Sequence, residues 1–533
     1  MNKIATYLNQ HLLGEASSAK AVRKRLSRDG SVLTMTPEIV VFPRVTNDIR
    51  KVARFTWQLA EKGHALAVTT RGAGGDTTGA AIGKGILLDL SAHLRSIVAV
   101  MPKDKLAHAQ AGASLEVLQE TLKWQGLTLA HLPDDLCHTT VGGAIAGNAW
   151  GTAGPFADNV ERLEVVLANG DIIETGRMSR HDVNKKLGLQ TFEGEIYRKL
   201  SGLLEDNEEL IKKMASDQTH DAVGYRSISR IKNRDGSIDL TPLFVGSQGT
   251  LGVISEAVLK TEFYSSHSTM ALIVGETPEL ARDLGDRLKE LEPSRLLTID
   301  GALLNRAVQY SKTFSLVGEE PISGAATLIA FNDISDRAQA HKLKKLRKLV
   351  SKMGLAMLDS TDHDQAGFAQ LFDAPNVLAR VAGDDEVTPP LLTGAYIPQD
   401  RREEFAGQVE ELAHKHHLDI PSVTNILTGV VSYYPPLKLH AVSDKQKLFR
   451  LMSDYATLVD RCGGAIVAED AEGRLKSSSA WALLDDDEAK LYEQIREVFD
   501  PFGTLNPGVK QKTDLRGLVS HLRTSYDTTD FLA

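Results

Sequence analysis

Three glycine-dense segments are the part of the sequence best suited to hold a phosphorylated ligand. The first, R-G-A-G-G-D-T-T-G at residues 71–79, lies between two apolar runs that predict strands. Because glycine has no Cβ, successive backbone N–H groups in such a segment converge into a concave nest for an anion. The segment has neither the G-x-G-x-x-G spacing of a Rossmann fingerprint nor the Gly-Lys-Thr/Ser ending of a P-loop. It therefore predicts an anion-binding loop of another kind.

Two further segments share this composition. They are P-D-D-L-C-H-T-T-V-G-G-A-I-A-G-N at residues 133–148 and G-S-Q-G-T-L-G-V-I-S-E-A at residues 246–257. Their small residues let a backbone approach a flat or phosphorylated ligand closely. A single glycine-dense loop is usually only a turn. Three such loops, separated by predicted strands, are hard to explain by turn formation alone.

Length and charge limit the class of protein. A chain of 533 residues predicts two or three domains, and a net charge of −9 argues against nucleic-acid binding. Two cysteines, Cys137 and Cys462, are too few for a Cys-ligated iron–sulfur cluster, so we expect both to be small buried side chains in a reducing cytosol. With no apolar run of transmembrane length and no secretory segment, the sequence predicts a cytoplasmic protein. The basic stretch at residues 20–28 suits peripheral contact with an anionic membrane at its inner face, and the alternative is the solvated face of a helix.

The pattern of elements predicts an α+β protein. Between residues 36 and 265, strands mix with helices that begin at Asn47 and Ser114, and Asn169-Gly170 predicts a hairpin. A β-α-β rhythm from about residue 267 to 462 predicts a separate sheet covered on one side, with an irregular crossing at residues 359–390. We expect an N-terminal helical extension (1–35), a cofactor domain (36–265), a substrate-binding cap (266–468) and a C-terminal segment (469–533) that returns to the cofactor domain.

The order of these motifs resembles the PCMH-type FAD-binding family of the vanillyl-alcohol oxidase superfamily. P-R-V-T-N-D-I at residues 43–49 and D-P-F-G-T-L-N-P-G at residues 500–508 complete the likeness, which covers roughly residues 30 to 510. Within that family the chain is most similar to the FAD-linked dehydrogenases of D-lactate and other 2-hydroxy acids. The resemblance implies an FAD domain of two α+β subdomains, a ferredoxin-like α+β cap and a C-terminal return segment.

The resemblance also implies an extended FAD with its pyrophosphate in the loop 71–79. Some relatives tether FAD through a histidine in this loop, where Gly75 and Asp76 stand here, so we expect non-covalent FAD. A second tether on the cap, used by other relatives, stays open. The positions that match FAD contacts are Arg71, Gly72, Ala73, Gly74, Gly75, Asp76, Thr77, Pro133, Asp134, Thr140, Gly143, Gly147, Asn148, Gly252, Ile254 and Asn506.

The sequence departs from the metal-using 2-hydroxy acid dehydrogenases at two motifs. Those enzymes carry G-H-x-x-D-G-N-x-H and E-H-G-x-G-x-x, where this chain has T-G-V-V-S-Y-Y (428–434) and E-D-A-E-G-R (469–474). Ser432 and Asp470 stand where histidines are expected, and His440 is off register. Zinc or iron needs imidazole or thiolate, whereas carboxylates alone suit a hard ion such as Mg²⁺ or Mn²⁺. We expect loss of the metal, with a rebuilt site as the alternative.

The second motif supplies the candidates for catalysis. Glu469 and Asp470 are the candidate proton acceptors near the flavin, because paired carboxylates repel and one pKa is raised toward the useful range. Arg474 is suited to hold a substrate carboxylate, and Tyr433 or Tyr434 to cover the flavin. The alternative is a loop carboxylate neutralised by Arg474 or Lys476. A weaker cap candidate is Arg380.

The resemblance implies an enzyme that dehydrogenates a small 2-hydroxy acid such as D-lactate, or a related alcohol, by hydride transfer to flavin N5. Electrons then pass to a quinone, a separate redox protein or oxygen. Two alternatives remain: a carbohydrate or aldonolactone oxidase of the same fold, and a non-catalytic flavin-binding accessory protein with a degenerate cap site.

Overall fold

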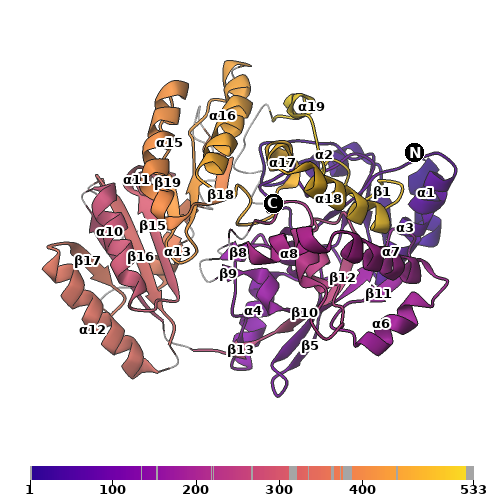
Figure 1. Cartoon of the computed structure of the whole chain (residues 1–533), viewed down its shortest axis with the longest axis horizontal. Coiled ribbons are helices and arrows are strands. Elements are labelled where there is room, and N and C mark those ends of the chain that lie inside the picture. Colours follow the sequence, from indigo (N-terminus) through magenta and orange to yellow (C-terminus); the bar gives the residue numbers. More distant parts are fainter. Residues whose placement is uncertain are drawn as a thin grey trace.

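The chain folds into two lobes, and its last helices return to the first of them. The computed structural model describes residues 3–133, 135–151, 154–217, 219, 221–265, 268–275, 277–310, 321–333, 335–361, 365–372, 374–375, 387–439 and 442–523. One lobe, at the right of Figure 1, contains the N-terminal half, and the other contains the strands and helices from β14 to α16. In the described part of the chain, no helix has both the length and the apolar composition needed to cross a bilayer.

The first sheet of the N-terminal lobe has four strands in the order β1-β2-β4-β3. The strands β2 (Ile39–Phe42), β4 (Ile86–Asp89) and β3 (Val68–Arg71) are parallel, and β1 (Glu15–Ser17) pairs antiparallel with β2. The N-terminal segment is therefore more than the expected helical extension: α1 (Lys3–His11) and α2 (Lys20–Arg25) flank an edge strand of this sheet.

The second sheet of this lobe is antiparallel, in the order β11-β10-β12-β6-β5. Its strands are β5 (Ile97–Met101), β6 (Leu106–Gln110), β10 (Val160–Val166), β11 (Ile172–Glu174) and β12 (Val253–Lys260). The expected hairpin joins β10 to β11, with Gly170 at φ +85°. Two short pairs complete the strands, β7 (Leu127–Thr128) with β13 (Glu262–Phe263) and β8 (Trp150–Gly151) with β9 (Gly154–Pro155).

The helices of the lobe begin close to where the sequence predicts. Helix α3 starts at Thr46 rather than at the expected cap Asn47, whereas Ser114 caps α4 by accepting a hydrogen bond from the Val117 N–H. The helices are α3 (Thr46–Glu61), α4 (Leu115–Trp124), α5 (Val141–Gly147), α6 (Arg180–Leu187), α7 (Phe192–Asp206), α8 (Glu208–Ser216) and α9 (Thr241–Phe244), with 3-10 turns η1 (Phe156–Asn159) and η2 (Arg226–Arg230).

The cap is a seven-stranded antiparallel sheet in the order β17-β14-β16-β15-β19-β20-β18. The strands are β14 (Thr269–Gly275), β15 (Arg295–Asp300), β16 (Ala325–Phe331), β17 (Ala356–Asp359), β18 (Leu392–Tyr396), β19 (Ser422–Asn425) and β20 (Val430–Tyr433). The helices are α10 (Pro278–Lys289), α11 (Gly301–Tyr310), α12 (Asp336–Lys352), α13 (Gln365–Phe372), α15 (Arg402–His416) and α16 (Val442–Arg461), with the 3-10 turn η3 (Gln399–Arg401).

Helices cover both faces of the cap sheet, not one face as expected. Leu303 of α11 and Phe368 of α13 pack with Leu297 and Leu328 on one face. Helices α10 and α12 pack on the other face, as do α15 and α16. Helix α13 also lies within residues 359–390, where we expected only irregular structure.

The C-terminal segment returns to the first lobe and packs against the N-terminal segment. It consists of α17 (Gly473–Ala482), α18 (Asp486–Phe499) and α19 (Leu515–Val519), which lie with the first lobe in Figure 1. Leu505 pairs with Val68 of β3, and Leu522 pairs with Leu33.

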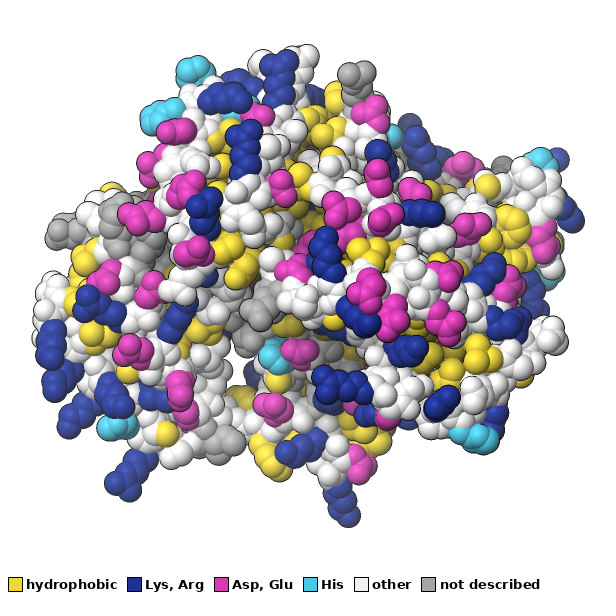
Figure 2. Space-filling view, in the orientation of Figure 1, with side chains coloured by type: hydrophobic (Ala, Val, Ile, Leu, Met, Phe, Trp, Pro, Cys, Tyr) yellow, Lys and Arg dark blue, Asp and Glu magenta, His cyan; other side chains and the backbone are white. Residues whose placement is uncertain are grey.

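The surface and the thiols give two smaller observations. Figure 2 shows acidic and basic side chains mixed over the visible face, as expected for a protein of small net negative charge. Both cysteines are free, but Cys137 is exposed, so only Cys462 is the buried thiol that we expected.

Candidate functional site

The first glycine-dense segment forms the crossover between the parallel strands β3 and β4. Its shape is fixed by Asp76, whose carboxylate accepts hydrogen bonds from the Thr78 N–H (3.1 Å), the Thr78 hydroxyl (2.9 Å) and the Ala80 N–H (2.7 Å). Gly74 has φ +83°, a conformation that side chains with a Cβ rarely adopt. The loop 71–79 therefore has a fixed backbone course that depends on glycine.

The first and second glycine-dense segments approach each other too closely for larger residues. A Cβ on Gly72 would lie 2.2 Å from the Thr140 hydroxyl oxygen, and a Cβ on Gly75 would lie 2.5 Å from the His138 carbonyl oxygen. Thr140 caps α5 and accepts a hydrogen bond from the Gly143 N–H (3.1 Å). These contacts bring the two segments side by side, as the sequence predicts for a shared ligand.

A hollow of about 630 Å³ lies between the three glycine-dense segments. Eight of the sixteen residues expected to contact FAD line it: Arg71, Gly72, Asp76, Thr140, Gly143, Gly147, Gly252 and Ile254. Gln248, Thr70 and Leu90 also line it and were not among the expected contacts. Gln248 was missed because its role depends on tertiary contacts: its side-chain amide donates to the Thr78 hydroxyl (3.3 Å) and its carbonyl oxygen accepts from the Gly473 N–H (2.9 Å).

A second hollow, of about 1440 Å³, continues from the first and reaches the cap. The loop residues 72–78, together with Pro133 and Thr140, form its floor. Its cap wall comes from Leu297, Phe372, Pro375, Pro390, Thr393, Gly394, Val423, Asn425, Val430, Ser432, Tyr434, Glu469 and Asp470. This arrangement places a carboxylate-bearing wall opposite the glycine-rich loop.

Glu469 and Asp470 both line the second hollow, where the sequence placed the base candidates. Asp470 has φ +59°, and its carboxylate accepts a hydrogen bond from the Trp150 N–H (3.3 Å). Across the same hollow, the His138 imidazole lies 3.0 Å from the Asp135 carboxylate. The sequence did not single out that pair.

The two tyrosines considered as covers for the flavin lie at the end of β20 and directly after it, and they point to opposite faces of the cap sheet. Successive side chains of a strand point to opposite faces of its sheet. Ser432 and Tyr434 line the hollow that faces the loops, whereas Tyr433 lies on the far face of the cap sheet beside Phe405 and Tyr455. Of the two, Tyr434 lies at the hollow and Tyr433 does not. The Ser432 hydroxyl accepts a hydrogen bond from the Gly394 N–H (2.9 Å).

Arg474 lies away from the second hollow, contrary to the expectation that it holds a substrate. Its side chain is 3% exposed, and its guanidinium donates to the Gly79 carbonyl (2.5 Å), the Pro507 carbonyl (3.0 Å) and the Asn506 amide oxygen (2.8 Å). Burial lowers the pKa of Arg474 to about 10, while Asp29 and Asp76 oppose this change. The residue fastens the C-terminal segment to the loop 71–79.

Asn506, expected as an FAD contact, has a similar part. Its side-chain amide donates to the Ala80 carbonyl (3.0 Å) and the Gln248 carbonyl (2.7 Å) and lines neither hollow. Asn148 also lines neither hollow, but its buried side-chain oxygen has no hydrogen-bond partner among the described residues. Three of the candidates discussed from the sequence lie outside the described residues: Asp134, Arg380 and His440.

No metal cluster is evident in the part of the chain that the structure describes. There, no group of three or more His, Cys, Asp or Glu side chains is arranged to hold an ion. The two positions where histidines were expected, Ser432 and Asp470, both lie at the second hollow.

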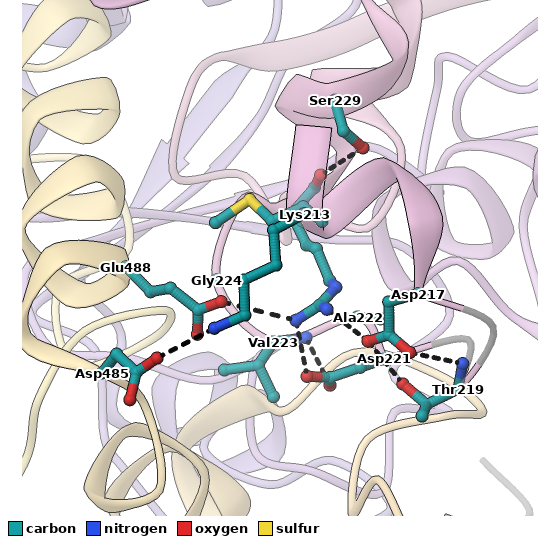
Figure 3. Close-up of polar contacts among 12 residues, drawn as sticks. Lys213, Asp217, Thr219, Asp221, Ala222, Val223, Gly224, Ser229, Asp485 and Glu488 are labelled. Carbon is teal, nitrogen blue, oxygen red and sulfur yellow. Dashed lines mark hydrogen bonds and ion pairs between the residues drawn. The ribbon is translucent and has the colours of Figure 1, made fainter. Parts of the chain in front are cut away.

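A polar cluster around Arg226 contacts the segment that leads to Glu469. The Arg226 guanidinium forms ion pairs with Asp217, with Asp221 at 3.4 Å and with Glu488 at 4.0 Å. Figure 3 shows these three acidic residues. The next residue, Ala222, donates its N–H to the Val467 carbonyl (2.8 Å). The Arg226 cluster is thereby connected, through Ala222, to the irregular segment that leads to Glu469.

Asp29, near the N-terminus, lies next to the loop 71–79 and was not among the residues singled out from the sequence. Asp29 is 3% exposed; one of its oxygens accepts from the Ser31 N–H (3.0 Å) and hydroxyl (2.5 Å), and the other has no partner among the described residues. Burial, together with the negative charge of Asp76, raises the pKa of Asp29 to about 6. Gly30 donates its N–H to the Gly74 carbonyl (3.0 Å), so this buried acid is part of the loop's support.

Asp29→Asn is expected to stabilise the FAD-free protein at alkaline pH. The native state binds the Asp29 proton more tightly than the unfolded state, so this group's stabilising contribution is present below about pH 4 and is lost as pH rises through about 6. Removing the charge should raise the free energy of unfolding by about 1–3 kcal/mol near pH 8. Thermal unfolding midpoints across this range test the expectation. Asp104→Asn, which changes an exposed carboxylate, is the control. If Asp29→Asn shifts the unfolding midpoint equally at low and at high pH, the expectation is wrong.

Comparison with known proteins agrees with this geometry. A family model described as FAD binding domain matches residues 37–176, and one described as FAD linked oxidases, C-terminal domain, matches residues 266–509. The chain belongs to the FAD-linked oxidoreductases. The first hollow of this FAD-linked oxidoreductase lies within its N-terminal lobe, and the second reaches from there to the cap. A Cβ added to Gly147, which lines both hollows, would meet no atom within 4 Å, so the open space beside it fits a bound dinucleotide.

Relatives of this FAD-linked oxidoreductase include hydroxy-acid enzymes. It is 25% identical to the D-2-hydroxyglutarate dehydrogenase of Haemophilus influenzae over 97% of this chain and 53% of that protein. It is 23% identical to glycolate oxidase subunit GlcD of Bacillus subtilis, over 90% of each chain. The chain thus spans about half the length of the first of these relatives.

Solved structures confirm the expected fold class. The structure of p-cresol methylhydroxylase with substrate bound superposes with a TM-score of 0.68, at 13% identity, over 94% of each chain. At this identity the likeness shows the PCMH-type α+β fold alone.

Proposed function

We propose that this chain is an FAD-dependent dehydrogenase that oxidises the alcohol carbon of a 2-hydroxy acid such as D-lactate, or of a related alcohol. The observation that carries the proposal is the second hollow, in which Glu469 and Asp470 face the glycine-rich loop. The printed activities of the two hydroxy-acid relatives support the choice of substrate class.

The residues of the chain divide the work between binding and proton transfer. Bound FAD supplies a two-electron acceptor for the hydride that leaves the alcohol carbon. The Glu469 or Asp470 carboxylate accepts the hydroxyl proton, so that the alcohol becomes a carbonyl. Tyr434, Phe372 and Leu297 close the cap side of the hollow with apolar surface, which limits water near the reacting carbon.

FAD is expected to be bound without a covalent link. No histidine stands in the loop 71–79, the position used for a tether in some relatives. Acid or heat precipitation should therefore release intact yellow FAD into the supernatant, measured by its absorbance and fluorescence. Flavin that stays with the precipitated polypeptide would mean that a tether exists, for example on the cap.

Anaerobic flavin reduction across a panel of hydroxy acids, aldonolactones and sugars tests the proposed activity. A small 2-hydroxy acid should bleach the oxidised flavin, and treatment with EDTA should leave the rate unchanged because both histidine positions are replaced. Restoration of an EDTA-sensitive rate by Zn²⁺ or Mn²⁺ would show a metal site rebuilt from other ligands. Failure of every compound would support a non-catalytic flavin-binding protein.

One observation favours the carbohydrate or aldonolactone alternative. Among the described residues that line the second hollow, the charged side chains are Asp76, Asp135, Glu469, Asp470 and the titratable His138, without a lysine or arginine. A neutral polyhydroxy substrate suits such a wall. The same panel separates the two substrate classes, since the compound with the highest rate identifies the class.

The electron acceptor is proposed to be a quinone, a separate redox protein or oxygen. The chain has two cysteines, which cannot form a Cys-ligated iron–sulfur cluster. We further propose a cytoplasmic protein whose basic helix α2, which buries none of its residues, is the segment available for peripheral contact with the inner face of a membrane.

A further inference from the structure

Lys476 is a buried ammonium group directly behind the carboxylate wall. It lies in the first turn of α17, with 7% of its side chain exposed. Its ammonium donates one hydrogen bond, to the Thr393 carbonyl (2.7 Å) of the cap, and no second acceptor is found among the described residues. Thr393 itself lines the second hollow. A buried ammonium with only one acceptor requires nearby negative charge to remain protonated.

The Lys476 ammonium lies beside the backbone that positions Glu469, because Gly394, the residue after Thr393, accepts the Glu469 N–H with its carbonyl (3.3 Å). Four carboxylates interact electrostatically with this ammonium. Burial lowers the pKa of Lys476, and Asp470, Glu469, Asp76 and Glu472 oppose that change, in decreasing order of effect. They come from three parts of the chain: the cap's exit loop, the loop 71–79 and the start of α17.

The negative charges of two of these carboxylates are already balanced by other groups. Glu472 is fully buried and forms an ion pair with Lys510 at 2.7 Å. Asp76 accepts three hydrogen bonds within its own loop and interacts electrostatically with the half-buried Arg71 and the buried Arg474. The charge of Lys476 is therefore balanced chiefly by Asp470 and Glu469, and Arg474 interacts instead with Asp29 and Asp76.

We propose that Lys476 is the positioning residue that keeps the Glu469–Asp470 pair ionised and ready to accept the substrate's proton. This rests on the proposed function. Two adjacent carboxylates repel each other, so the pair holds a proton more tightly than either carboxylate would alone. A buried cation nearby offsets this repulsion, and low local polarity makes its effect larger than in water.

A purely structural role predicts a different result. The hydrogen bond to Thr393 also joins α17 to β18, so loss of Lys476 alone could loosen the cap. Loosening would lower the rate or FAD occupancy at every pH. It would not move the pH at which the carboxylate pair loses its proton.

The test compares Lys476→Met, which keeps length and burial, with Lys476→Arg, which keeps the charge. The exposed Lys490→Met on α18 controls for net charge. In the rate of anaerobic flavin reduction against pH, Lys476→Met should move the acidic limb upward by about one pH unit or more. Lys476→Arg and Lys490→Met should leave that limb near its wild-type position. An acidic limb that Lys476→Met does not move overturns the proposal.

A second measurement does not require turnover. The absorption spectrum of the resting FAD-loaded protein is titrated with acid, because ionisation of carboxylates beside the flavin perturbs its spectrum. The transition should lie higher in Lys476→Met than in wild type, and equal transitions, or none in either protein, contradict the proposal. If no compound reduces the wild-type flavin, the proposed function fails while this titration still decides the role of Lys476. Lys476→Gln replaces the methionine variant if the latter does not retain FAD.

Discussion

Gly74→Val is expected to abolish FAD retention while leaving the cap folded. Gly74 has φ +83°, and an added Cβ would lie 2.0 Å from the Arg71 guanidinium nitrogen. Valine disfavours this backbone conformation, and its side chain would force the guanidinium away from the Arg28 carbonyl, to which it donates at 2.6 Å. FAD affinity should fall at least about tenfold, which the flavin-to-protein absorbance ratio after gel filtration measures.

A matched variant separates loop function from backbone strain. Gly63 has nearly the same conformation, φ +81°, but an added Cβ there meets no atom within 4 Å. Gly63→Val should therefore lose some thermal stability and keep its FAD. Full flavin occupancy in Gly74→Val, with circular dichroism like that of wild type, would show that the loop 71–79 is an ordinary turn.

Glu469→Gln should lower the rate of flavin reduction by about 10²–10⁴-fold with FAD still bound, because an amide cannot accept the hydroxyl proton. Glutamine preserves size, so the wall of the hollow should keep its shape. Stopped-flow reduction of the anaerobic enzyme measures the step directly, and the flavin absorbance of the same sample reports occupancy.

The neighbouring carboxylate supplies the comparison. Asp470→Asn retains the side-chain oxygen that accepts the Trp150 N–H, so it should leave the loop intact. If Asp470 is the base, Asp470→Asn should lower the rate of flavin reduction more than Glu469→Gln does. If Glu469 is the base, Asp470→Asn should lower that rate only mildly. Glu497→Gln, on the exposed side of α18, should leave the rate unchanged. Wild-type rates in both Glu469→Gln and Asp470→Asn would exclude the pair as the proton acceptor.

The close approach of the glycine-rich loops was predictable because it depends on local properties of the sequence. Gly72, Gly74 and Gly75 are needed for backbone conformation or close approach, and such needs leave a dense run of glycines in the sequence. The pairing of Glu469 and Asp470 was visible for the same reason, since adjacent residues share one loop. Both features are local along the chain.

At the candidate site, the sequence did not show the direction of individual side chains. Whether Tyr433 or Tyr434 faces the hollow depends on the register of β20 against β18 and β19, and a one-residue difference reverses the answer. Arg474 and Lys476 are two residues apart on α17, and the sequence could not show which of them faces the carboxylates. Asp29 lay in a segment expected to be only helical, and its burial depends on Arg523, almost 500 residues later, whose guanidinium donates to the Asp29 and Leu33 carbonyls.

The joining of both chain ends behind the loop 71–79 constrains when the cofactor can be captured during synthesis. Arg474, Asn506 and Arg523 all contact this loop or its immediate support. A ribosome emits the glycine-rich loop early, but more than 400 further residues must follow before Arg523 emerges. N-terminal domains commonly fold while synthesis continues, yet this one lacks the contacts that support the loop 71–79, the proposed site of the FAD pyrophosphate, until the segment 474–523 has been translated. Tight FAD capture is therefore a late event, and a nascent chain stalled before Arg474 should expose an incomplete loop to chaperones.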